Sequence, residues 1–174
     1  MKSLAIMTAS CIVLAAPATA RAENFKATLI GYEEVPAVST VASGEFRAKY
    51  DKKNQFFDYE LTYSDVQGTV QQAHIHFGQA GVNGSIVIWL CQTATTPAPP
   101  AVAALTPVCP PSAGGTVTGT ITAANIIAAS TLSQRILAGE FDEVIDAMQA
   151  GVAYANVHAT PLNPGGEIRG QIKN

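Results

Sequence analysis

The sequence predicts an all-β sandwich of about eight strands, with one short helix before the last two strands. Three observations support this fold class. Apolar and polar residues alternate in most segments, turn-forming residues separate these segments at short intervals, and a single stretch has helical spacing instead. Once an N-terminal leader is removed, about 150 residues remain, enough for one domain with a proper core.

The expected strands follow one another at regular spacing. The first covers residues 25–32. The next two cover 44–50 and 56–63, and the turn-forming residues 51–54 between them predict a hairpin. The remaining expected strands are 72–78, 85–90, 115–122, 153–159 and 167–172. This succession is typical of a Greek-key or immunoglobulin-like β-sandwich.

One segment breaks the β pattern shortly before the last two strands. Phe141, Val144, Ile145 and Met148 are spaced as on one face of a helix. Acidic residues lie in the first turn, where they complement the helix dipole, and Gly151 can end the helix. We therefore expect a short helix over residues 141–148.

Residues 1–22 have the features of a cleaved secretory signal peptide. A lysine precedes an apolar stretch, and Ala20-Arg21-Ala22 has the small-x-small pattern that signal peptidase cuts. A lipoprotein signal ending at Cys11 fits less well, because the residues before it lack the usual leucine. No later segment approaches the roughly 20 apolar residues needed to span a bilayer. The expected domain is thus 23–174, and the expected location is periplasmic or secreted.

Two cysteines remain after the leader. Cys91 and Cys109 flank residues 92–108, which are rich in proline, alanine and threonine and have no periodicity. In an oxidising compartment a disulfide between them is the simplest interpretation. The alternative, a cysteine-based metal site, would need more ligands at short spacing than the chain offers.

All three histidines of the chain lie in two segments with strand character. A single residue separates His74 from His76, so both imidazoles share one face of a strand, roughly 6.5 Å apart at about 3.3 Å per residue. His158 lies in the second segment, near the C-terminus. Apolar residues occupy the opposite face of both segments. The histidines should therefore lie on the outer face of the sheet or in a polar cleft.

If the two strands are neighbours, His74, His76 and His158 would form a three-nitrogen metal site suited to zinc or copper. Two other interpretations stay open. The histidines would face solvent or make ordinary hydrogen bonds, or they would belong to a polar patch that binds a ligand or partner. The distance from His158 to the other two decides between a shared ion and the other interpretations.

The sequence contains no strong motif for nucleic-acid binding, hydrolysis or phosphate binding. The net charge of −3 becomes more negative without the leader, and the basic residues are scattered, so a nucleic-acid partner is not expected. No serine lies in a Gly-x-Ser-x-Gly elbow, and no glycine-rich phosphate loop precedes a helix. Glu167 and Arg169 share a strand face, which a structural ion pair or an edge strand explains. We assign no catalytic or cofactor-binding residue and lean against an enzyme.

Four stretches of the chain resemble the CHRD domain, a repeat of chordin that also occurs singly in secreted bacterial proteins. They are residues 27–36, 73–78, 81–84 and 154–172, and the His-Ile-His strand and the Gly-Glu-Ile-Arg-Gly-Gln tail are the most specific. The resemblance implies a predominantly β fold and an exported location. It also implies a non-enzymatic binding or interaction module, whose partner would be an unknown extracytoplasmic protein or glycan.

A looser resemblance is to copper/zinc superoxide dismutase, a Greek-key sandwich with a His-x-His strand, a later histidine and a Gly-Gly motif. Here His74, His76 and His158 match, which implies a copper- or zinc-binding protein as the alternative function. The chain has too few histidines for a two-metal site. Glu167 also stands where that family has an arginine that attracts the substrate anion, so dismutase activity is not expected.

Overall fold

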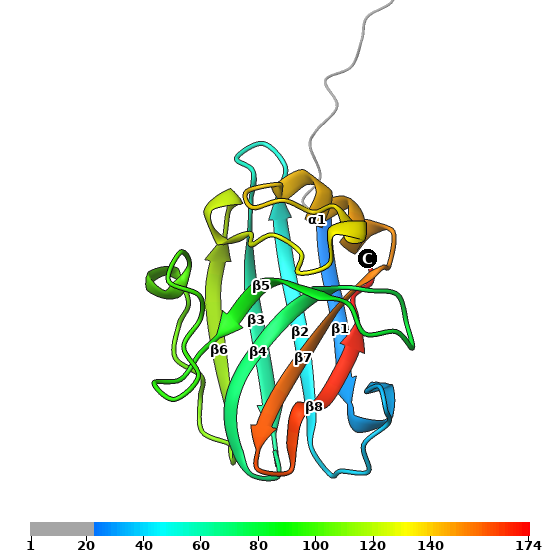
Figure 1. The fold of residues 1–174 in the computed structure, drawn as a ribbon, viewed down its shortest axis with the longest axis vertical. Helices are drawn as coiled ribbons and strands as arrows, with labels where there is room; N and C mark the ends of the chain where they lie inside the picture. The colour runs from blue at the N-terminus through cyan, green and yellow to red at the C-terminus, as the bar shows by residue number, and fades with distance from the viewer. Residues whose placement is uncertain (1–22) are drawn as a thin grey trace, which may run out of the picture.

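The computed structural model describes residues 23–174, and the predicted signal peptide at 1–22 lies outside the described residues. Residues 23–174 form eight strands and one α-helix (Figure 1). They are β1 (Glu23–Ile30), β2 (Ser43–Asp51), β3 (Phe56–Ser64), β4 (Thr69–Phe77), β5 (Ser85–Cys91), β6 (Gly114–Ile121), α1 (Phe141–Gln149), β7 (Ala153–Thr160) and β8 (Asn163–Gln171). The predicted all-β class, the eight strands and the helix before the last two strands are confirmed.

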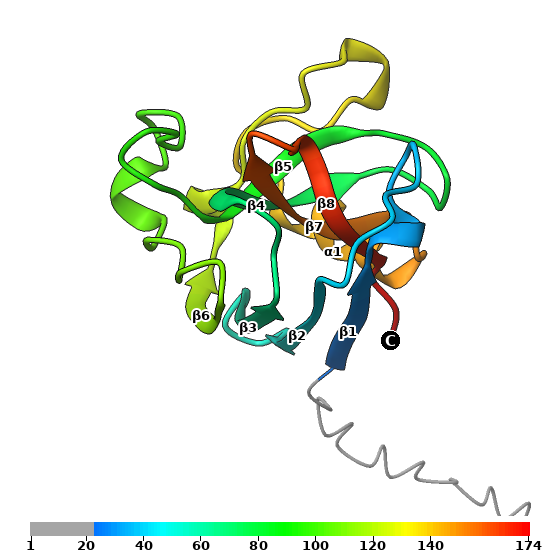
Figure 2. The ribbon, with the colours of Figure 1, turned by 90° about the horizontal axis from the view of Figure 1, so that it is seen from below.

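The strands form one antiparallel sheet in the order β5-β4-β7-β8-β1-β2-β3-β6. The sheet folds over, so that β5, β4, β7 and β8 cross in front of β1, β2, β3 and β6 (Figure 1). Figure 2 shows these two halves as facing layers. The end strands β5 and β6 lie close together, which makes the sheet nearly closed.

The apolar faces of the two layers meet in a single core. Alternation along each strand supplies the inward side chains, as in Phe25, Ala27 and Leu29 of β1. The helix α1 packs at one end of this core, where the Phe141 ring lies 6.0 Å from the rings of both Tyr50 and Phe57. The alternation that predicted the strands therefore also places the core.

The long connection between β5 and β6 is held at its base. Cys91 and Cys109 form the predicted disulfide, with Cα atoms 4.9 Å apart. The neighbouring Gln92 side chain donates to the backbone oxygens of Ala103 and Thr106 and accepts from the amide of Ala98. A segment without periodicity is thus held at its base by one disulfide and by the half-buried side-chain amide of Gln92.

The last strand begins four residues earlier than predicted. Residues 163–166 contain proline and glycine, which favour a loop over a strand interior. In the structure they form the start of β8, beside the turn that joins it to β7, where proline is tolerated. None of the helices in the described part of the chain is long and apolar enough to cross a membrane.

Candidate metal centre

The three histidines come together on two neighbouring strands. His74 and His76 lie on β4, His158 lies on β7, and these strands pair antiparallel. In this register His76 is opposite Tyr154 and His74 is opposite Asn156. The apolar neighbours Ala73, Ile75 and Val157 point into the core, so the histidines lie on the outer face of the sheet, as predicted.

The outer face of β4 and β7 is nevertheless buried. The exposed fraction is 0% for His74 and 7% for both His76 and His158. This excludes the interpretation that they face solvent. Two loops border this face: residues 31–42 between β1 and β2, whose Glu34 lies beside Asn156, and residues 78–84 between β4 and β5, whose Gly84 oxygen accepts from His76. The Asn83 side chain joins the loops by donating to the Val35 carbonyl at 3.0 Å.

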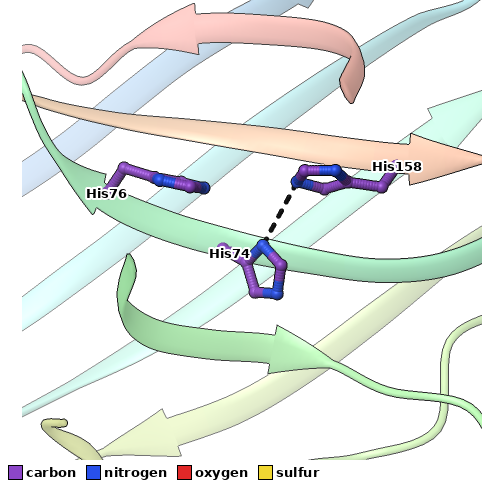
Figure 3. A group of neighbouring side chains, drawn as sticks. All are labelled: His74, His76 and His158. Carbon is purple, nitrogen blue, oxygen red and sulfur yellow. Dashed lines mark hydrogen bonds between the residues drawn. The ribbon is translucent and has the colours of Figure 1, made fainter. Parts of the chain in front are cut away.

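The imidazole nitrogens converge on one point. Nδ1 of His74 lies 3.2 Å from Nε2 of His158, and one nitrogen of each ring lies within 4.8 Å of the others. Figure 3 shows the rings of His76 and His158 pointing toward one another, with His74 beside them. Zinc–nitrogen bonds of about 2.0–2.1 Å allow two ligands of one ion to lie at most about 4.2 Å apart. The His74–His158 pair fits this limit, and the 4.8 Å spread of the whole set requires the rings to draw closer together on binding.

Backbone carbonyls orient two of the rings. The Nδ1–H of His76 donates to the Gly84 oxygen at 2.9 Å, and the Nδ1–H of His158 donates to the Pro164 oxygen at 2.9 Å. A neutral imidazole has a single N–H, so the Nε2 atoms of both rings carry lone pairs that face inward. Metal-binding histidines commonly have this second hydrogen bond, which fixes the tautomer and the ring direction.

The same environment keeps the imidazoles neutral. Burial lowers the pKa of all three histidines, because removal from water disfavours the charged ring. The pKa of His76 falls to about 4, and that of His74 is lowered further by the two neighbouring rings. At neutral pH the lone pairs needed for metal binding are therefore free of protons.

Aromatic rings form the walls of the site. Trp89 of β5 packs edge-on against His74, with ring centroids 4.3 Å apart. Tyr154 stacks on His76 at 4.6 Å, and the Arg169 guanidinium lies 3.3 Å from the Tyr154 ring centroid on β7. The Tyr154 hydroxyl accepts from the Gly84 amide. Gly84, whose carbonyl orients His76, is therefore itself held in place.

Two further residues of the site escaped the sequence analysis. Asn156 on β7 is 2% exposed, and its Oδ1 lies 3.1 Å from Nε2 of both His76 and His158. Glu34 is 6% exposed, and burial raises its pKa to about 7, although Arg169 acts against this. Asn156 shares a strand face with His158, which is the signal that could have found it. Nothing local in the sequence marks Glu34 as buried.

The expected ion pair between Glu167 and Arg169 is wrong, as is the edge strand, because β8 lies between β7 and β1. Arg169 donates to the backbone oxygens of Gln79 and Val82, at 3.1 and 3.0 Å. Glu167 instead accepts from the Thr40 hydroxyl and the amide of residue 67. Each side chain therefore holds a different covering segment, Arg169 the 78–84 loop and Glu167 the 31–42 loop.

Together, the fold and the site define an all-β domain with a buried three-histidine cluster on its outer face. The family model of the CHRD domain matches residues 25–172. The chain therefore belongs to the CHRD domain family, as its His-x-His strand and its C-terminal tail predicted. No curated protein and no solved structure gives a match.

Proposed function

We propose that this CHRD domain is an exported, non-enzymatic binding module whose ligand is a copper or zinc ion held by His74, His76 and His158. The observation that carries the proposal is the convergence of the three ring nitrogens within 4.8 Å. Two of the rings are already oriented by backbone carbonyls, so little rearrangement accompanies binding.

The donor atoms favour copper or zinc over other ions. Imidazole suits zinc and copper, whereas calcium and magnesium require oxygen ligands. The site lies beneath the 31–42 and 78–84 loops, and its histidines are at most 7% exposed. This enclosure supports a role in holding an ion rather than presenting it to a substrate.

Export is supported by the Cys91–Cys109 disulfide, which is typical of oxidising compartments. Intact mass measurement of the protein from its native host should give a chain that starts near Glu23 and carries the disulfide. A full-length chain with free thiols would contradict export.

Metal binding can be measured through Trp89, the single tryptophan of the chain. Because its ring lies 4.3 Å from that of His74, bound copper(II) should quench its fluorescence strongly. We expect saturation at one copper per chain, and competition by zinc should restore the emission. Elemental analysis of the protein before and after dialysis provides the independent count of ions.

The matched variants are His76→Gln and His158→Gln, with Gln72→Ala on the same strand as control. Both histidine variants should lose binding, while the control keeps the wild-type titration. Circular dichroism verifies that each variant is folded. Equal binding by the wild type and both folded histidine variants would overturn the metal proposal.

A second candidate function is the binding of an extracytoplasmic protein or glycan. A groove of about 800 Å³ on the outer face of β1, β2, β3 and β6 is lined by charged residues of both signs, including Lys26, Arg47 and Glu60. If a polar partner binds there, Arg47→Glu should abolish its recovery from the native envelope, and Lys53→Glu should not. Failure of the wild type to recover any specific partner would count against this function.

A further inference from the structure

The side chain of Asn156 lies among the histidines as if it were part of the metal shell. Its Oδ1 is 3.1 Å from Nε2 of His76 and 3.1 Å from Nε2 of His158. Both rings use their Nδ1–H on backbone carbonyls at the shorter distance of 2.9 Å. Nε2 of His158 can accept a hydrogen from Nδ1 of His74 at 3.2 Å. No hydrogen, however, lies between Oδ1 of Asn156 and either Nε2 atom, so the oxygen faces two electron-pair acceptors.

Such an arrangement is repulsive unless a positive charge lies at its centre. An isolated amide would relieve it by turning its NH₂ group toward the two lone pairs. Here the Asn156 side chain also lies close enough to the Glu34 carboxyl to lower the pKa of that carboxyl, which is the contact expected of its NH₂ group when Oδ1 faces the rings. Glu34 is buried and packs directly over Gly166, so it is restrained on the far side as well. The amide is thus oriented with its oxygen toward the rings.

Three separations among the four donor atoms match a coordination shell, whereas the three histidine nitrogens as a set spread over 4.8 Å. Metal bonds of about 2.0–2.1 Å separate neighbouring ligands by about 3.3 Å in a tetrahedral shell and by about 2.9 Å in a square one. The measured separations are 3.1 Å, 3.1 Å and, between His74 and His158, 3.2 Å. All three fall between these limits.

From this geometry we propose that Oδ1 of Asn156 is the fourth ligand, completing a shell of three nitrogens and one oxygen, and that Glu34 is the positioning residue that orients the amide. This inference rests on the proposed three-histidine site. The fourth ligand makes the proposed site a closed one for a divalent copper or zinc ion, with no coordination position left for a substrate.

The test uses zinc and copper(II) alone, with the full mature chain. Asn156→Asp keeps an oxygen in place and adds negative charge, so zinc affinity should rise. Asn156→Leu removes the oxygen, and affinity should fall by about tenfold or more. A merely structural asparagine would weaken binding in both variants. The matched control is Asn125→Asp, a buried asparagine whose Oδ1 accepts from Thr122.

Copper(II) electron paramagnetic resonance gives the second readout. Asn156→Asp should shift the copper parameters, because the oxygen donor becomes anionic, while the splitting from three nitrogens persists. Glu34→Gln should weaken zinc binding without changing the number of nitrogens. If the wild type binds metal and the Asn156 variants match it in affinity and spectrum, the fourth ligand is refuted and the three-histidine site stands. Absence of binding by the wild type refutes both.

Discussion

Replacing Glu34 with glutamine should stabilise the metal-free protein, but only at higher pH. The Glu34 carboxyl is 6% exposed, and desolvation raises its pKa from 4.5 to about 7. Between these values the folded state holds a proton that the unfolded state has released. The unfolding free energy therefore falls as pH rises from 4.5 to about 7. A shift of this size corresponds to about 3 kcal/mol at 1.36 kcal/mol per unit.

The histidines act in the opposite direction and must be separated from this effect. The pKa of His76 is lowered from 6.5 to about 4, so its contribution is present above the unfolded value and is lost as pH falls. This contribution is common to the wild type and Glu34→Gln. The difference in unfolding free energy between the two proteins therefore isolates Glu34.

The assay is guanidinium unfolding followed by circular dichroism, in the presence of EDTA, from about pH 4 to about pH 8.5. The Glu34→Gln protein should gain about 3 kcal/mol relative to the wild type across this range, with most of the change below about pH 7. The control is Glu33→Gln, which changes the exposed neighbour and should leave the difference near zero. A flat difference for Glu34→Gln would refute the buried carboxyl as the cause.

Three other substitutions test the supports of the fold. Replacing both Cys91 and Cys109 with alanine should cost about 3 kcal/mol in chemical unfolding, given the 18-residue separation. Gly166→Ala should cost about 1–3 kcal/mol in thermal unfolding, because φ is 128° and a methyl group would collide with Glu34. Arg169→Met should cost at least about 2 kcal/mol and speed amide hydrogen exchange in the 78–84 loop, whose carbonyls lose their donor.

The fold was predictable because its signals are local. In β1 every second residue is buried, and the same pattern recurs in β2 and β3. In α1 all four residues of the predicted stripe, Phe141, Val144, Ile145 and Met148, are buried, together with Ala147. The largest errors were at the starts of β4 and β8, which lie three and four residues before the predicted ones. The start of β8 was misplaced because proline and glycine are poor strand formers that pairing at a hairpin end tolerates.

The site was predictable only in part. Alternation correctly placed His74, His76 and His158 on the outer face, and it did so from neighbouring residues alone. It could not show that this face is buried, because the 31–42 loop is distant in sequence and the 78–84 loop, although it directly follows β4, is held by the distant Arg169. Glu34, for example, lies 122 positions before Asn156, whose amide it orients. The burial of this polar face therefore depends on how distant segments of the chain pack together, which local alternation does not reveal.

That topology also explains why polar residues occur on the covered face. The 31–42 and 78–84 loops bring backbone carbonyls and amides over the sheet, and buried groups of this kind require partners. Arg169 supplies hydrogens to the carbonyls of Gln79 and Val82, and His76 supplies one to Gly84. Once His76 has used its single N–H in this way, its other nitrogen can only accept. The hydrogen bond that holds the loop thus also creates the inward lone pair, so loop closure and the proposed metal binding depend on the same imidazole.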